Sequence, residues 1–281
     1  MDSRQRVIDY YNKTHFGYKL VWGLYNNLSM HYGFYDADHR SHNEAVINLN
    51  RVLSRMAKIT KKDKILDVCC GFGGSSIWLA KTFGAKVTGI DINKKHIAIA
   101  RSLARENHVD HLVDFFVMDA NKTDLINESF SVVWVIEPMV HIKNKEILVS
   151  EMRRLLKKEG RLVAADFFLT RDKYSKDERK LLDRWMTGWC GQNMSRVKEF
   201  KGYLKNEKFS GIKFFDVTSS IMPSSRRMYF ICHFTFPAGK IFQLFGLKSN
   251  IQTNSSFSGI CQYKALKKGL WTYGIFYGEK N

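Results

Sequence analysis

Between residues 60 and 170 the chain alternates short apolar stretches with longer stretches that mix apolar and polar residues. The short stretches are typical of buried strands, and the longer ones place apolar residues on one face of a helix. Strands that alternate with helices in this way predict an α/β fold with a doubly wound, mostly parallel sheet. The predicted strands are residues 64–68, 86–92, 113–120, 131–137 and 161–168, and the predicted helices are residues 75–83, 94–108 and 144–158.

The two ends of the chain break this rhythm. Residues 1–58 have helical spacing interrupted at HYGFYD, and we expect them to form an N-terminal helical cap. After Thr170 come a charged helical stretch, a strand at 211–220 and a last alternating strand at 270–278. No crossover helix of the earlier kind joins these two strands, so we expect an antiparallel pair at the sheet edge. The aromatic remainder of residues 171–281 is expected to form a lid.

The charge of the chain bears on its partners. Lys and Arg number 45 against 27 Asp and Glu, which gives a formal net charge of +18 and a pI near 9.7. This favours an anionic partner, namely nucleic acid, a lipid surface or a phosphorylated small molecule, although solvated lysine faces explain it equally well. The basic residues are spread along the chain without a recognisable RNA-binding module, so nucleic acid is the weakest of these partners.

Two further features bear on location. The polar N-terminus has no apolar signal-peptide core, and the five cysteines lack the spacing of a disulfide framework. We therefore expect reduced thiols rather than a zinc site, and a cytoplasmic protein. The apolar stretch 228–247 is interrupted by His233, Pro237 and Lys240, so we expect a buried or lipophilic cap there rather than a transmembrane span. Peripheral membrane contact stays open, and the sequence does not indicate an oligomeric state.

A glycine-rich corner, CCGFGG, joins the first predicted strand to the helix after it. Ligands of open parallel sheets bind at such corners, and Gly71 and Gly73 let the backbone come close to one. The next strand ends at Asp91, whose carboxylate could accept both hydroxyls of a ribose. NAD or FAD would fit these features, but the G-x-G-x-x-G spacing is incomplete because Ser76 stands at the third position. Asp67, inside the first strand, could receive an ammonium group of the ligand or anchor the amides of the loop.

The stretches LDVCCGFGG, GIDI, VMDA and LKKEGRLVAAD resemble the motifs of class I S-adenosylmethionine-dependent methyltransferases. The resemblance implies a Rossmann-like core at residues 59–170 that binds S-adenosyl-L-methionine. It implies that the glycine corner lies against the methionine portion and that Asp91 holds the ribose. It also implies that Ile92 packs on the adenine and that Asp119 accepts from the adenine amino group, with Ala120 beside it. Cys69 departs from the family, which usually has its first glycine at this position. The residues expected to contact the cofactor are Tyr32, Asp67, Gly71, Gly73, Asp91, Ile92, Asp119, Ala120 and Ile136.

Four other stretches resemble enzymes that methylate small molecules. LSMHYGFYD is similar to a segment of tocopherol, cyclopropane-fatty-acid and terpenoid methyltransferases, which implies that His31, Tyr32 and Gly33 face the methyl group; ordinary helix-cap packing is the alternative. WMTGWCGQN, SSRRMY and KKGLWTYGIFYG are similar to bacterial C-methyltransferases of prenyl diphosphates and to natural-product O-methyltransferases. A diphosphate would be held by arginines, and Mg²⁺ could bind it too. The residues expected to contact the substrate are Tyr11, His31, Trp185, Trp189, Arg226 and Arg227.

Glu137 stands where the fourth predicted strand ends, and His141 follows four residues later. A carboxylate and an imidazole in an aromatic cleft suit acid–base catalysis, so both are candidate catalytic residues. The alternative is that Glu137 contacts the cofactor and His141 is a polar wall. Attack of an alkene on a methyl donor leaves a carbocation, which aromatic faces can stabilise. We therefore expect C-methylation of an isoprenoid, such as a prenyl diphosphate, with Glu137 as the base; O- or N-methylation of a small natural product is the alternative.

Overall fold

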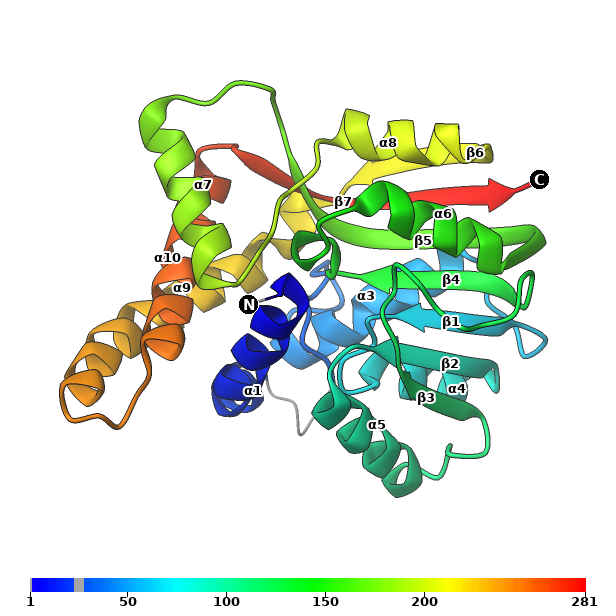
Figure 1. Ribbon diagram of the computed structural model, residues 1–281, viewed down its shortest axis with the longest axis horizontal. Helices are drawn as coiled ribbons and strands as arrows, with labels where there is room; N and C mark the ends of the chain where they lie inside the picture. The colour runs from blue at the N-terminus through cyan, green and yellow to red at the C-terminus, as the bar shows by residue number, and fades with distance from the viewer. Residues whose placement is uncertain (1, 23–27) are drawn as a thin grey trace.

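The computed structural model describes residues 2–22 and 28–281 (Figure 1). Its centre is a sheet whose strands lie in the order β3-β2-β1-β4-β5-β7-β6. The first five of these run parallel, and β7 runs antiparallel between β5 and β6. The predicted doubly wound sheet with an antiparallel edge is confirmed. The strands are β1 (Lys64–Val68), β2 (Lys86–Asp91), β3 (Val113–Val117), β4 (Phe130–Ile136), β5 (Leu156–Leu169), β6 (Phe209–Asp216) and β7 (Trp271–Lys280).

Helices cover both faces of the sheet because successive strand residues point to opposite sides. Ile65 and Val132 share a buried cluster with the apolar faces of α3, α4 and α5. Their neighbours Leu66 and Val133 belong to a second cluster, which α6 and α8 complete. The helices are α1 (Ser3–Trp22), α3 (His42–Met56), α4 (Gly74–Phe83), α5 (Lys94–Glu106), α6 (Lys145–Leu155), α7 (Lys176–Gly188), α8 (Val197–Asn206), α9 (Thr218–Leu244) and α10 (Asn250–Lys267), with a 3₁₀ turn η1 (Met139–His141).

Local sequence signals set where several helices begin. Ser41 and Glu44 form a capping box at the start of α3, and Ser175 and Glu178 form another at the start of α7. In each pair the serine hydroxyl accepts from the glutamate N–H, and the glutamate carboxylate accepts from the serine N–H. Ser249 begins α10 in the same way, with a glutamine as its partner.

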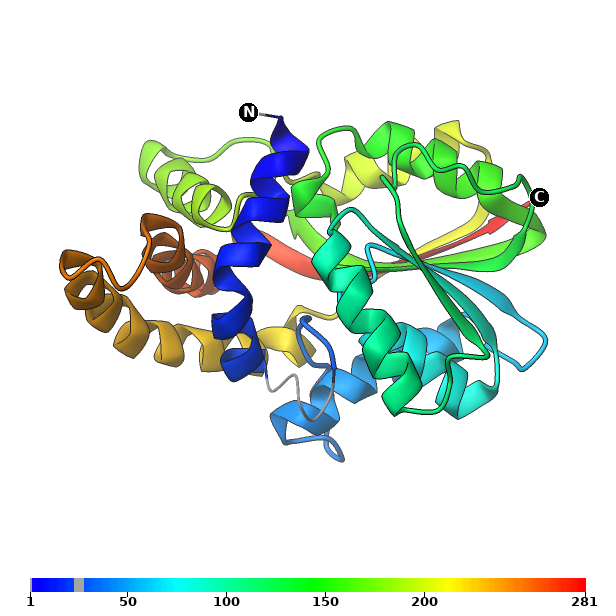
Figure 2. The same cartoon turned by 60° about the horizontal axis from the view of Figure 1, so that its bottom comes forward.

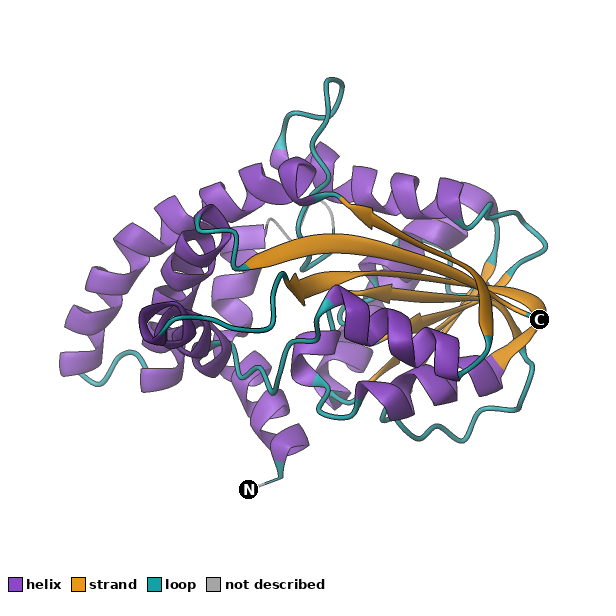
Figure 3. Cartoon of the chain, turned by 90° about the horizontal axis from the view of Figure 1, so that it is seen from above, coloured by secondary structure: helices purple, strands orange, loops and turns teal. Residues whose placement is uncertain are grey.

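α1, α7, α9 and α10 gather at the carboxyl ends of the parallel strands (Figures 1 and 2). α9 and α10 pack side by side and extend beyond the sheet; we call residues 218–267 the arm (Figure 3). The strand predicted at 211–220 ends at Asp216, because the Asp216 carboxylate accepts from the Thr218 N–H and α9 begins there. Within the part of the chain that the structure describes, no helix has both the length and the apolar character that crossing a bilayer requires.

Candidate active site

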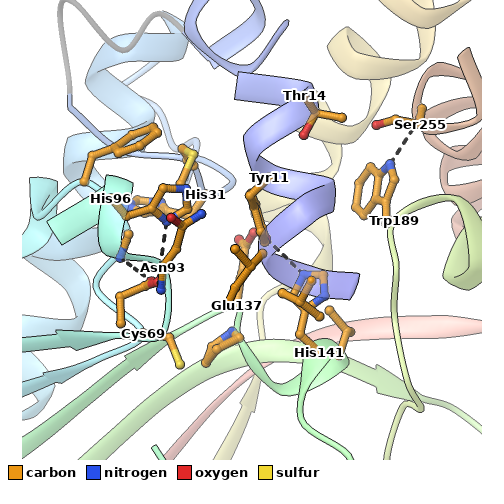
Figure 4. Close-up of a pocket in the computed structure, with 18 of the residues that line it drawn as sticks. Tyr11, Thr14, His31, Cys69, Asn93, His96, Glu137, His141, Trp189 and Ser255 are labelled. Atoms are coloured by element: carbon orange, nitrogen blue, oxygen red, sulfur yellow. Dashed lines mark hydrogen bonds and ion pairs between the residues drawn. The ribbon is translucent and has the colours of Figure 1, made fainter. Parts of the chain in front are cut away.

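A cavity of about 930 Å³ lies at the carboxyl ends of the parallel strands (Figure 4). Its floor is the glycine corner after β1, together with the ends of β2 and β4. α1 lies along one wall, and α9 and α10 of the arm form another. The position agrees with the rule that ligands of open α/β sheets bind outside the carboxyl ends of the strands.

The glycine corner is held by Asp91 at the end of β2. The Gly71 N–H donates to Asp91 Oδ2 at 3.1 Å, and the Asn93 N–H donates to Oδ1 at 2.7 Å. Gly71 has φ +54°, and Cys69 has φ +59°, a conformation that costs a residue with a Cβ about 1 kcal/mol or more. The strain at Cys69 explains why a glycine suits this position in the resembling family.

The other two glycines of the corner serve close packing. A Cβ on Gly74 would lie 2.2 Å from the Leu28 carbonyl oxygen, so the glycine lets the segment before α3 close over the corner. A Cβ on Gly73 would lie 2.6 Å from the ring of Phe115. Gly73 does not line the cavity, which corrects its predicted contact with the cofactor. Gly71 does line the cavity.

Asp67 lines the cavity and is also anchored to α4. Its Oδ2 accepts from the Ser76 hydroxyl at 2.6 Å, and burial raises the pKa of its carboxyl to about 7. Both roles predicted for it, a ligand contact and a structural anchor, are therefore geometrically available.

The far side of the corner carries Asp119 and a residue that the sequence analysis missed. Asp119 Oδ1 accepts from the Asn121 N–H at 2.9 Å, and Oδ2 pairs with Arg4 of α1 at 3.0 Å. The side-chain oxygen of Asn121 is buried at the cavity and has no hydrogen-bond partner among the described residues. An unpaired buried acceptor fits a ligand that donates a hydrogen bond there. Ile92, Ala120, Ile136 and Tyr32 also line the cavity, and their contact with the cofactor stays a prediction.

Glu137 occupies the corner after β4 with φ +60°, another left-handed backbone at a residue with a Cβ. Both hydrogen bonds that it accepts from described residues end on Oε1, from the Tyr32 N–H and the Tyr273 hydroxyl, each at 2.8 Å. Burial raises the pKa of the carboxyl to about 8, although these two hydrogen bonds oppose the rise. No residue that the structure describes donates to Oε2, whose lone pairs are therefore available for a group in the cavity.

Two histidines flank this carboxyl. His141 Nε2 lies 3.0 Å from the Tyr11 hydroxyl, and Figure 4 shows Tyr11 pointing from α1 toward Glu137 and His141. His31 Nδ1 lies 2.9 Å from the Tyr32 carbonyl oxygen, so it donates, while Nε2 is buried without a partner among the described residues. Burial lowers the pKa of both imidazoles to about 4, which keeps them neutral at pH 7.

Three of the predicted substrate residues lie elsewhere. Trp185 is 1% exposed and packs among aromatic rings of the core, whereas Trp189 does line the cavity. Arg226 and Arg227 do not line it either. Met228 does, and Arg226 lies about 200° away from it around α9. The cavity therefore gives no support to the expected arginine contacts to a diphosphate, which stay a prediction. Among residues 2–22 and 28–281, no group of three or more His, Cys, Asp or Glu side chains could hold a metal ion.

Comparison with known proteins adds the family. Residues 65–160 match the family model described as a methyltransferase domain. The chain is 27% identical to tocopherol O-methyltransferase of Arabidopsis thaliana, over 78% of this chain and 67% of that protein. It is 32% identical to 27-O-demethylrifamycin SV methyltransferase of Amycolatopsis mediterranei, over 53% of each, so the match spans about half of that relative.

Solved structures share the fold over the whole chain. The geranyl diphosphate C-methyltransferase of Streptomyces coelicolor aligns with a TM-score of 0.75, covering 100% of this chain and 98% of that one at 16% identity. At this identity the likeness concerns the fold alone. The domain match and the relatives agree with the motifs of the glycine corner, and residues 65–160 form a methyltransferase domain of the class I S-adenosylmethionine-dependent kind.

Proposed function

We propose that this methyltransferase methylates a lipophilic small molecule held in the cavity, and that Glu137 accepts the proton that the acceptor loses. The observation that carries the proposal is the Glu137 carboxyl, which presents a free Oε2 between the glycine corner and the arm. S-Adenosylmethionine, when bound, supplies a methyl group on a positively charged sulfur, already activated for in-line displacement. The chain must then supply mainly position and a proton acceptor.

The residues at the corner fit this cofactor. The Asp91 carboxylate is fixed by two backbone N–H groups and still has lone pairs for the ribose hydroxyls. The unpaired oxygen of Asn121 suits the amino group of an adenine. Gly71 exposes backbone without a Cβ at the position proposed for the methionine portion.

The other half of the cavity suits an apolar acceptor. Phe167, Trp189, Met228, Ile231 and Phe242 line it, and they come from β5, the segment after α7, and α9. Aromatic faces stabilise a passing carbocation by up to ~2 kcal/mol when water is excluded. We therefore keep C-methylation of an isoprenoid alkene as the first form of the proposal, without the diphosphate group.

O-Methylation of a hydroxyl group is the second form. The names of the tocopherol and rifamycin relatives support it. His31 supports it too, because its unpaired Nε2 is a second place for a hydroxyl proton. N-Methylation has no comparable support from the cavity.

Glu137→Gln tests the role of the carboxyl. The acceptor is found first, by mass spectrometry of products formed from methyl-labelled S-adenosylmethionine and a panel of alkenes, phenols and amines. The substitution should lower kcat by ~10²–10⁴ while cofactor affinity is kept, because shape and hydrogen bonding survive and basicity is lost. The rise of kcat/KM toward about pH 8 should disappear with it.

Glu159→Gln is the matched control, because the backbone of Glu159 is also in the left-handed region, with φ +60°. Glu159 is exposed in β5 and does not line the cavity. If Glu137→Gln lost cofactor affinity together with kcat, Glu137 would be a cofactor ligand and not the base. Unchanged turnover would remove it from the mechanism.

A further inference from the structure

The outer face of α9 is apolar although it faces solvent. Its exposed residues follow the helical period, with Phe230, Phe234, Ile241 and Phe245 spaced so that they share one side. Phe234 is 77% exposed and Leu244 is 86% exposed. We call this set, completed at the end of the helix, the outer stripe: Phe230, Phe234, Ile241, Phe242, Leu244, Phe245 and Leu247.

The outer stripe is not needed to hold the arm together. The opposite face of α9 packs against α10 and lines the cavity through Met228, Ile231 and Cys232. Exposed side chains in such number, gathered along one element, mark a surface that meets another apolar phase.

The charge of the arm indicates what kind of partner this apolar surface meets. Residues 217–278 contain no Asp or Glu at all. The same span carries seven cations, which are Arg226, Arg227, Lys240, Lys248, Lys264, Lys267 and Lys268. A second copy of the chain would bring like charges together, whereas an anionic lipid surface complements both the charge and the outer stripe.

We propose that the arm docks on an anionic lipid surface, with the outer stripe of α9 in the interfacial layer of the bilayer. Lys240, the exposed cation beside the stripe, lies at the level of the lipid phosphates. The contact is peripheral, and it involves only the tip and outer face of the arm.

The cavity adds a consequence for the acceptor. Phe242 and Leu247 belong to the outer stripe, are 51% and 74% exposed, and also line the cavity. The cavity therefore reaches the surface at the tip of the arm. A docked arm lets a lipophilic acceptor pass from the bilayer into the cavity without crossing water; this consequence, unlike the docking itself, rests on the proposed function.

Vesicle flotation with the whole chain tests the docking. The probes are vesicles of phosphatidylcholine alone and of phosphatidylcholine with 30% phosphatidylserine, without cofactor or acceptor. The chain should float with the anionic vesicles and at least tenfold less with the neutral ones.

The double change Phe234→Ser and Phe245→Ser should lower the partition coefficient by roughly tenfold or more. Lys240→Gln should lower it by about fivefold, and only with the anionic vesicles.

Ile126→Ser is the matched control, because Ile126 is 81% exposed in the loop before β4, outside the arm. It should bind vesicles as the unaltered chain does, and circular dichroism should show that every variant is folded. Absence of binding to anionic vesicles, or normal binding by the double phenylalanine variant, would overturn the proposal. A dimer that sedimentation velocity detects for the unaltered chain and not for the double phenylalanine variant would also overturn the proposal, because the stripe would then join two copies of the chain. Because the flotation assay contains no cofactor, a failure of the chain to bind vesicles can be distinguished from a failure of methyl transfer.

Discussion

Burial displaces the pKa of two carboxyls and two imidazoles that line the cavity. It raises the pKa of Asp67 to about 7 and of Glu137 to about 8, and it lowers the pKa of His31 and His141 to about 4. Each shift favours the uncharged form because the charged form loses its hydration. Near neutral pH the imidazoles are uncharged and the carboxyls are close to titration. A cationic ligand would therefore find carboxyls that ionise beside it.

The raised pKa of Glu137 predicts a pH-dependent stability. The folded chain holds this proton up to about pH 8, whereas the unfolded chain releases it near 4.5. The contribution is thus fully present below about pH 4.5 and is lost as pH rises through about 8. Glu137→Gln removes this loss, so the variant should be more stable than the parent by roughly 1–3 kcal/mol at pH 9 and nearly equal at pH 5. Urea unfolding at both pH values measures this, and a difference independent of pH would contradict the burial of the carboxyl.

At the scale of elements, α1 is fastened over the cavity by polar contacts. Arg4 pairs with Asp119, Tyr11 meets His141, and the Asn93 side chain donates to Asn12 at 3.2 Å. The Tyr11–His141 and Asn93–Asn12 hydrogen bonds contribute only about 1 kcal/mol net each, and the Arg4–Asp119 pair is screened by water because Arg4 is exposed. α1 can therefore open at modest cost, which a cap over a ligand site requires.

Weakening these contacts should expose α1 to protease. Arg4→Gln with Tyr11→Phe should speed tryptic cleavage after Lys13 about fivefold, because the Tyr11–His141 hydrogen bond of about 1 kcal/mol is lost together with the exposed Arg4–Asp119 pair. S-Adenosylmethionine should slow the same cleavage in the unaltered chain. Cleavage in the exposed turn at Lys61 and Lys62 serves as the internal control and should not change. Equal rates at Lys13 in all conditions would show that α1 is not a closing cap.

Local patterns predicted the sheet well and the site in part. The bounds of β1 were predicted as observed, because a short buried strand bounded by polar residues is a local signal. Tyr273 meets Glu137 across 136 residues, and Arg4 meets Asp119 across 115, so no local pattern could predict either contact. Trp185 was misplaced for a related reason, since an aromatic residue on a helix gives no sign of whether its face meets a core or a cavity.

At the scale of the molecule, one sheet serves two regions of different chemistry. Its carboxyl end carries the polar corner with Asp91 and Asn121, and the arm adds an apolar wall that ends at an exposed tip. Our proposed division into 1–58, 59–170 and 171–281 is a division of roles only, because β6 and β7 of the third segment complete the sheet. Part of the excess of positive charge lies in this region, since residues 217–278 have seven Lys and Arg and no Asp or Glu.

The most direct test of the account is calorimetric titration of the chain with S-adenosylmethionine and with NAD. We predict that S-adenosylmethionine binds and NAD does not. Asp91→Ala should weaken binding by about 10- to 100-fold, since the ribose hydroxyls and the Gly71 N–H lose their acceptor, at ~1–3 kcal/mol. Asp110→Ala, at an exposed position away from the cavity, should bind as the parent does. Tight binding of NAD, or unchanged S-adenosylmethionine affinity in Asp91→Ala, would contradict the account.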